Sequence, residues 1–377
     1  KFNGMATFTD AIFEDRSVIS TVDEFAEFND SADFGNSTFN RIASFNKAKF
    51  NGPAYFNSAK FKSGANFWGA TFKELSFGGK TEFNRDAGFE DCKINGNAYF
   101  GNTSFYSNAY FNKAKFEGSA NFERVKFNDG ETIFDEAVFY NKAIFNDANF
   151  SGNRASFNSS HFKDDALFEN TTFLTSVYFQ KLKHGKLYIR WRSIKNSLNY
   201  DNTVFLSLID NFEKLGYIED ADCSYYVYRK KHRGEDWDLE TTSGDFKDMD
   251  ESFRKFIELL LEHLYAYGVD PLRPFYYSVL VVFSFSLAWL NIGRSGLLSE
   301  LEDQHLITEK IRRIILSLWV SFFFSLKVFL AGTRLFVEPP EIPENFKKYK
   351  WIYFMERLLG ALLFGLMFLA VSRSIIR

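Results

Sequence analysis

Large apolar residues recur along residues 28–179 at a spacing that neither a helix nor a flat strand has. From Phe34 the anchors alternate steps of five and six residues: Phe34, Phe39, Phe45, Phe50, Phe56, Phe61, Phe67 and Phe72. After a slip near Phe77 the pattern resumes, with Ile94 in one place, and continues through two seven-residue steps to Phe179. A helix face repeats every ~3.6 residues and a strand face every ~2, so neither element buries all these rings together.

A small residue stands two positions before nearly every anchor. These residues are Ala43, Ala48, Ala54, Ala59, Ala65, Ala70, Ala98, Ala109, Ala114, Ala120, Ala143 and Ala148. A coil with four short sides of about five residues each would point every ring and every small residue inward, stacked on the next coil at about 4.8 Å. We therefore expect roughly seven coils of about 20 to 22 residues, forming a rod about 33 Å long.

The phrases ANF, AKF and AYF resemble the A-(D/N)-(L/F)-x-x units of the pentapeptide-repeat family, over residues 28–179. The resemblance implies a right-handed quadrilateral β-helix. The extra residue in every second unit departs from the plain repeat and predicts a bulge at alternate corners. Some members of this family are acidic DNA mimics, but this segment has 16 Lys and Arg against 17 Asp and Glu, too neutral for that role. We expect a scaffold or a docking surface for a cytoplasmic protein.

After Leu187 the apolar spacing becomes helical. The first helix ends at Gly216, and a second runs from about Glu219 to Lys231. The first carries Phe205, Leu208, Ile209, Phe212 and Leu215 on one face. A third helix is predicted to bury Phe253, Phe256, Ile257, Leu260, Leu261 and Leu264 and to expose Arg254, Lys255, Glu258, Glu262 and His263. The basic run at 229–233 is either a contact with anionic lipid or a partner, or a solvated helix end.

Two segments near the end are long and apolar enough to cross a membrane. Twenty residues without charge lie between Arg273 and Arg294, and a second candidate covers residues 351–372; at ~1.5 Å per residue, each matches about 30 Å of hydrocarbon. The thirteen apolar residues 314–326 between them predict a re-entrant half-helix. Basic residues flank the start of the first span and the end of the second, which predicts that both the N-terminal domain and the C-terminus are cytoplasmic.

This plan resembles the membrane domain of two-transmembrane ion channels related to potassium channels, over residues 268–377. LWVSFFFSLKVFLAG stands where such channels have the pore helix and filter, and ERLLGALLFGLMFLAVSR is similar to the inner helix. YGVDPLRP resembles the sequence that precedes the first span in pentapeptide-repeat proteins with such a domain. The TVGYG filter is missing, and SLKVFLAGTR stands in its place, so potassium selectivity is not expected.

The candidate pore or filter residues are Ser325, Lys327, Gly332, Thr333 and Glu356. Lys327 either faces an ion path, where a ring of copies would favour anions, or extends to the lipid headgroups. Glu356 either pairs with Arg357, pairs with a neighbouring pore helix or marks the outer interface.

The inner-helix glycines Gly360 and Gly365 serve either helix packing or a gating hinge.

The remaining composition excludes several classes of protein. The formal charge is −3, from 45 Lys and Arg against 48 Asp and Glu, which gives no argument for nucleic-acid binding. Two cysteines and no metal-ligand spacing indicate no disulfide framework, no metal and no cofactor. No catalytic motif is present, so we expect no enzyme and no catalytic residue.

The sequence thus predicts a multi-domain chain: a pentapeptide-repeat β-helix at 1–186, a helical neck at 187–267 and a transmembrane pore domain at 268–377. The expected function is a homo-oligomeric, tetrameric ion channel of the cell membrane, with anion or non-selective permeation. Its expected partners are the lipid bilayer, the permeating ions, other copies of the chain and a cytoplasmic protein on the repeats. The alternative is a non-conducting, membrane-tethered scaffold.

Overall fold

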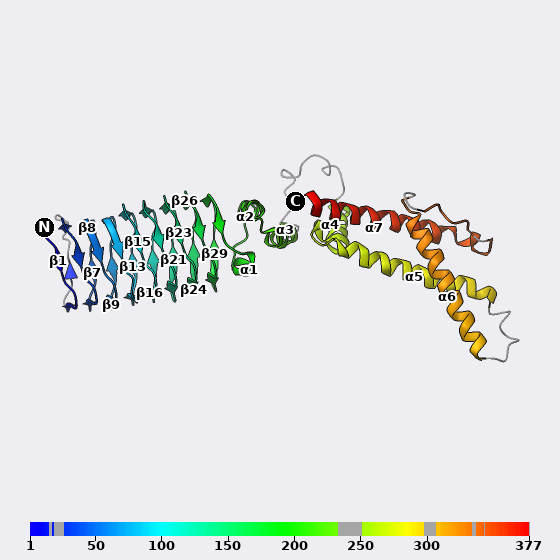
Figure 1. Cartoon of the computed structure of the whole chain (residues 1–377), viewed down its shortest axis with the longest axis horizontal. Coiled ribbons are helices and arrows are strands. Elements are labelled where there is room, and N and C mark those ends of the chain that lie inside the picture. The colour runs from blue at the N-terminus through cyan, green and yellow to red at the C-terminus, as the bar shows by residue number, and fades with distance from the viewer. Residues whose placement is uncertain are drawn as a thin grey trace. The chain divides into compact units, whose positions relative to one another are not determined.

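The computed structural model describes residues 1–14, 17–18, 26–232, 251–297, 307–333, 337–342 and 344–376. The chain divides into two compact units, Lys1–Tyr228 and Arg229–Arg377. The described strands all lie in the first unit, and the long apolar helices lie in the second (Figure 1). The neck predicted at 187–267 is divided between the two units.

The first unit is a β-solenoid in which each turn contributes four short strands, one to each side. Every strand pairs in parallel with the strand on the same side of the next turn, and the ladders form three sheets. Two sides belong to one 15-stranded sheet, because β8 and β11 run through a corner and join them; the other two sides are sheets of eight strands, which corresponds to about eight turns.

The strands of the first side are β4 (Glu27–Phe28), β8 (Lys49–Tyr55), β11 (Thr71–Ser76), β14 (Lys93–Ile94), β18 (Lys115–Phe116), β22 (Val138–Phe139), β26 (His161–Phe162) and β30 (Lys183–His184). The second side shares β8 and β11 and adds β1 (Ala6–Thr7), β5 (Ala32–Asp33), β15 (Ala98–Tyr99), β19 (Ala120–Asn121), β23 (Ala143–Ile144), β27 (Ala166–Leu167) and β31 (Leu187–Tyr188).

The third side holds β2 (Ile12–Phe13), β6 (Thr38–Phe39), β9 (Lys60–Phe61), β12 (Glu82–Phe83), β16 (Ser104–Phe105), β20 (Lys126–Phe127), β24 (Asn149–Phe150) and β28 (Thr172–Phe173). The fourth holds β3 (Ser17–Val18), β7 (Ala43–Ser44), β10 (Ala65–Asn66), β13 (Ala87–Gly88), β17 (Ala109–Tyr110), β21 (Glu131–Ile133), β25 (Arg154–Ser156) and β29 (Ser176–Tyr178).

The register confirms the predicted coil. Ala43 lies beside Ala65 and Ala65 beside Ala87, so one turn takes 22 residues there. Turns that include a seven-residue step are one residue longer, as in the pairing of Phe116 with Phe139. The anchors form stacked columns of rings inside the solenoid, with ring centroids 4.7 Å apart between Phe39 and Phe61 and again between Phe61 and Phe83. Edge-to-face contacts between columns fill the centre.

The corners alternate between two kinds. Each five-residue step from Phe34 to Phe72 contains a tight turn with one residue in the left-handed region, at Asn36, Lys47, Ser58 and Gly69 in successive steps. The extra residue of the six-residue steps lies in wider bends at the other corners. The slip near Phe77 appears as a register shift between β8 and β11 after Phe72. The strands are regularly paired both before and after this shift.

Cys92 occupies a small-residue position, two residues before the anchor Ile94. Its side chain is fully buried, and its thiol donates to the Phe67 carbonyl oxygen at 2.9 Å. Burial raises the pKa of the Cys92 thiol far above its usual range. The thiol is therefore a packing group.

Three helices close the C-terminal end of the solenoid: α1 (Trp191–Ile194), α2 (Asn202–Lys214) and α3 (Ile218–His232). The α2–α3 hairpin confirms the predicted pair, and Gly216 takes the left-handed conformation that ends α2. Trp191, Phe205 and Phe212 are buried in the same core as the ring columns. Asp201 caps α2 by accepting from the backbone N–H groups of residues 203 and 204.

Asn211 of α2 completes the last turn of the ladder. Its side-chain amide accepts from the Leu187 N–H at 3.0 Å and donates to the Leu187 carbonyl at 2.8 Å. It thereby satisfies the backbone groups of β31 that would otherwise pair with another strand. The end of this sheet edge is therefore closed by a side chain.

The second unit contains α4 (Glu251–Tyr265), the short 3₁₀ turn η2 (Ala266–Gly268), α5 (Leu272–Leu297), α6 (Ile307–Leu330), η3 (Glu344–Tyr349) and α7 (Lys350–Ile376). Residues 272–292 and 347–372 are long and apolar enough to cross a membrane, as predicted for the two spans. Both helices run side by side in opposite directions, and α6 crosses them (Figure 1). Helix α6 is longer than the predicted segment 314–326, since it includes the charged residues that precede it.

Candidate functional site

A buried polar cluster joins the three long helices of the second unit. Glu356 of α7 is fully buried, and its carboxyl group accepts from the indole N–H of Trp289 on α5 at 2.8 Å. Its other oxygen contacts the hydroxyl of Ser325 on α6, which is also fully buried. Ser325 in turn donates to the Val282 carbonyl of α5 at 2.8 Å. Two of the predicted pore residues, Ser325 and Glu356, therefore meet each other inside one chain.

The hydroxyl of Ser325 has one proton but two acceptors within reach. When it donates to Val282, its contact with Glu356 is a hydrogen bond only if the carboxyl group supplies the proton. The cluster thus links the three long helices through the side chains of Trp289, Ser325 and Glu356.

Arg357 follows Glu356 on α7 but is directed elsewhere. Its guanidinium lies 5.7 Å from the centre of the Tyr353 ring. One of its terminal nitrogens lies 3.4 Å from the Ala331 carbonyl just after α6. Glu356 therefore contacts Ser325 of α6 and Trp289 of α5, and Arg357 lies against other groups.

Two of the predicted glycines allow close approach between α6 and α7. A Cβ atom on Gly360 would lie 2.2 Å from the Phe329 carbonyl oxygen, and one on Gly332 would lie 2.4 Å from the Arg357 carbonyl oxygen. Gly365 is exposed, and a Cβ atom there would meet no atom within 4 Å. Gly332 and Gly360 therefore serve packing in this structure, while Gly365 has open space.

The remaining candidates lie at the end of α6. The side chain of Lys327 is exposed, whereas its neighbour Val328 is fully buried between the helices. Residues 325–330 are α-helical, and Thr333 lies in the bend that follows. The backbone carbonyl groups of Lys327 and Phe329 accept from the N–H groups of Ala331 and Gly332, so this stretch does not present an uninterrupted row of free carbonyl oxygens, as a potassium filter does.

Sequence reasoning missed Trp289. It lies near the end of the first apolar segment and is almost fully buried. Its indole N–H needs an acceptor when buried, and that requirement was the only available signal. The acceptor, Glu356, is 67 residues away along the chain, and no local pattern identifies it.

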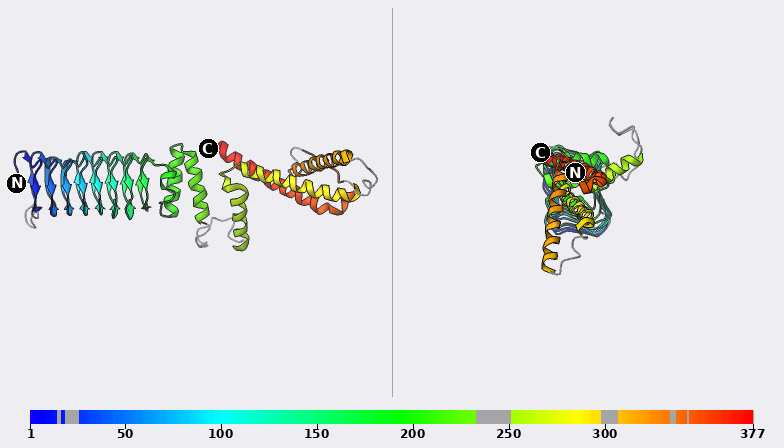
Figure 2. Two further views of the ribbon diagram at one scale, coloured as in Figure 1. Left: turned by 90° about the horizontal axis from the view of Figure 1, so that it is seen from below. Right: turned by 90° about the vertical axis from the view of Figure 1, so that its right-hand side faces the viewer.

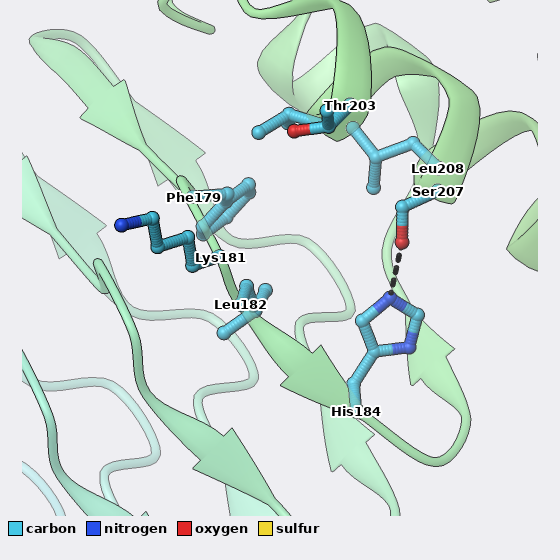
Figure 3. Close-up of a pocket in the computed structure, with 8 residues that line it drawn as sticks. Phe179, Lys181, Leu182, His184, Thr203, Ser207 and Leu208 are labelled. Atoms are coloured by element: carbon cyan, nitrogen blue, oxygen red, sulfur yellow. Dashed lines mark hydrogen bonds between the residues drawn. The ribbon is translucent and has the colours of Figure 1, made fainter.

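The first unit has a small cavity of about 160 Å³ between the last turn and α2 (Figure 3). His184 at its edge donates from Nδ1 to the Gly185 carbonyl and accepts at Nε2 from the Ser207 hydroxyl, at 3.1 and 3.2 Å. These contacts correspond to a neutral imidazole, and burial lowers the pKa of His184. The pair joins β30 to α2.

A wider groove lies on the fourth side of the solenoid, where small residues leave room between longer ones. It has a volume of about 740 Å³ and is lined by Asp86, Gly88, Glu90 and Tyr110, among others. The Glu90 side chain leans over Gly88, where a Cβ atom would lie 2.6 Å from its carboxylate. Burial raises the pKa of Glu90. In the described residues no group of His, Cys, Asp and Glu is arranged to hold a metal ion.

Comparison with known protein families confirms the repeat. Residues 34–81, 79–126 and 111–160 each match the family described as pentapeptide repeats (9 copies). The first unit therefore contains pentapeptide repeats in a β-solenoid. Comparisons with curated proteins and with solved structures gave no match.

Proposed function

We propose that the chain is a subunit of an oligomeric ion channel of the cell membrane, with the pentapeptide-repeat unit as a regulatory or docking domain. One observation carries the proposal. The last turns of α6 reach α5 at Val282, the midpoint of the apolar segment 272–292. Helix α7 begins at Lys350, and Glu356 in its second turn contacts Trp289 near the C-terminal end of the same segment.

This path supports a re-entrant helix between two spans. Helices α5 and α7 run in opposite directions, so α5 ends and α7 begins at the same end of the bundle. A helix that enters from that end and stops halfway gives an even number of crossings. With basic residues before the first span and after the second, the repeat unit and the C-terminus are then cytoplasmic.

Conduction requires several copies of the chain, because one bundle of three helices is filled by its own side chains. The middle of α6 leaves an apolar surface uncovered: Ile315, Leu316, Trp319, Val320 and Phe323 are each about half exposed or more. Neighbouring copies around a central axis would cover this surface, and the resemblance to two-span channels favours four. The side chain of Lys327, which is exposed in the single chain, can then face the central axis, and its positive charge favours anion or non-selective permeation.

The alternative is a non-conducting membrane-tethered scaffold. The helical conformation of residues 325–330 favours it, since several of their carbonyl groups, including those of Lys327 and Phe329, already accept backbone hydrogen bonds and are not free to replace an ion's hydration shell. Neither function assigns a catalytic group.

The test is ion current through the purified full-length chain in planar bilayers. Under a salt gradient we expect the Lys327→Glu variant to shift the reversal potential toward cation permeability, with Lys327→Gln between it and the unchanged protein. Lys327→Arg keeps the sign of selectivity and alters conductance. Lys60→Gln, at an exposed lysine of the solenoid, is the matched control and changes nothing.

Equal reversal potentials for all Lys327 variants would remove this residue from the ion path. Absence of current under every voltage, tension and ligand condition would favour the scaffold.

A further inference from the structure

In α4, Glu258 and Glu262 face inward and Phe256 is exposed, contrary to the prediction, whereas His263 is exposed as predicted. Glu258 pairs with Arg229 at 2.8 Å and Glu262 pairs with Lys230 at 3.6 Å. The side chain of Glu262 is almost completely buried, whereas Leu259 is 50% exposed and Phe256 is 54% exposed. The basic run at 229–233 was predicted to contact lipid or a partner, or to be a solvated helix end. In the structure Arg229 and Lys230 form ion pairs with α4. Arg233 lies outside the described residues.

These ion pairs fix which face of α4 is outward. Turning the apolar face inward would separate the buried carboxylate of Glu262 and the partly buried carboxylate of Glu258 from their cations, which is costly. The ring of Tyr267 adds to the arrangement, since the Arg229 guanidinium lies 5.1 Å from its centre. Among the described side chains of α4, those of Phe256, Leu259 and His263 therefore lie on the outward face, and all three are exposed.

The location of α4 indicates what covers that face. Only residues 266–271 separate its last residue from α5, and the first-turn residue Arg273 of α5 donates to the Glu262 carbonyl at 3.1 Å. Helix α4 is thereby held at the end of α5 where the apolar segment begins. The surface of α5 beyond this point is also apolar and exposed, at Leu272, Phe275, Tyr276, Val279, Leu280 and Phe283.

The direction of α4 completes the argument. Figure 2 shows α4 lying across the direction of α5 and α7, and Figure 1 shows it nearly end-on. Between the two helices the chain changes direction at Ala266, Tyr267 and Gly268, which all have positive φ. A helix that lies across a membrane span, at the end of that span, lies in the plane of the bilayer surface.

We propose that α4 docks on the lipid bilayer, with Leu259 and its neighbours on the outward face inserted at the boundary between headgroups and acyl chains. The proposal rests on the membrane insertion of α5 and α7. The inward ion pairs hold the helix in this orientation, and the crosswise direction places its whole outward face at one depth.

The experiment measures the depth of spin labels on the full-length chain in phospholipid vesicles. The background is Cys223→Ser, since Cys92 is buried and Cys223 is exposed. Labels are placed by Leu259→Cys and His263→Cys on α4. Leu206→Cys on α2 is the matched water control, because Leu206 and Leu259 are both 50% exposed, and Phe283→Cys on α5 is the control for the bilayer core. The readout is the ratio of collision with oxygen, which enters lipid, to collision with a water-soluble nickel chelate.

We expect the ratio at Leu259 and His263 to lie above that at Leu206 and below that at Phe283. A ratio at both α4 positions equal to that at Leu206, with Phe283 in the core, would overturn the docking of α4 and leave the membrane proposal intact. Shielding of both positions from both reagents would mean that protein covers the face, which also overturns it. Access of the nickel chelate to Phe283 would instead refute membrane insertion itself.

Discussion

Alanine at Gly360 and alanine at Gly365 should change the stability of the second unit in opposite directions. The two glycines lie on the same helix, five residues apart. A Cβ atom at Gly360 would lie 2.2 Å from the Phe329 carbonyl oxygen and 3.0 Å from the carbonyl carbon. Helices α6 and α7 would have to separate locally by about 1 Å to approach ordinary van der Waals distance.

The magnitudes follow from these distances. Overpacking costs about 1–3 kcal/mol, and an approach of 2.2 Å to backbone atoms, which cannot rotate away, belongs to the upper part of that range, about 2–3 kcal/mol. The higher helix propensity of alanine returns about 1 kcal/mol. Gly360→Ala should therefore lower the free energy of unfolding by about 1–2 kcal/mol. At Gly365 the same substitution meets nothing within 4 Å, so only the propensity term remains and the helix gains about 0.5–1 kcal/mol.

The assay is thermal unfolding of the purified full-length chain in detergent, followed by helical circular dichroism, with both variants measured beside the unchanged protein. Midpoints that shift in the same direction, or a Gly360→Ala variant with an unchanged midpoint, would refute the close packing of α6 on α7. If Gly365→Ala also reduces channel opening while it raises stability, the open space at Gly365 serves bending.

Two further predictions concern the solenoid. Phe111→Asp should unfold the repeat locally, because the ring is fully buried and stacks on Phe89 at 4.9 Å, and a buried unpaired carboxylate is costly. The control is Tyr99→Asp, at a ring that is 44% exposed. The measurement is limited proteolysis, and equal cleavage of both variants would contradict the assignment of Phe111 to the interior. Lowering the pH should weaken the docking of α2. Burial lowers the folded-state pKa of His184 below its ordinary value of 6.5, so its contribution is fully present above that value and is lost as the pH falls through the folded pKa. Denaturant unfolding at several pH values should show this slope, and a His184→Gln variant with the same slope would assign it to another group.

The repeat was predictable because every coil repeats the same physical requirement. A ring and a small residue must point inward on each side, so the five- and six-residue steps are visible in the sequence without any knowledge of partners. Even the slip near Phe77 leaves its mark, as the register shift after Phe72. The two apolar helices were predictable for a similar reason, since length and absence of charge decide whether a helix can span a bilayer.

The contacts between helices were not predictable in the same way. The spacing of α4 alone places Glu258 and Glu262 on a polar face, and only the cations of the neighbouring segment make that face the buried one. The length of α6 was underestimated because charged residues continue a helix where its apolar part stops. Whether Lys327 faces an ion path depends on other copies of the chain, and this stays a prediction.

Because helices close the C-terminal end of the solenoid, the number of turns can change without any change in the structure of that end. Ala98 lies beside Ala120 in the next turn, so inserting one such turn adds 22 residues and lengthens the rod by about 4.8 Å. The contacts of Asn211 with Leu187 involve only the last turn, so the added turn leaves them unchanged. Duplication of whole turns can thus move the far end of the repeats in regular steps while the helices at the other end are held as before.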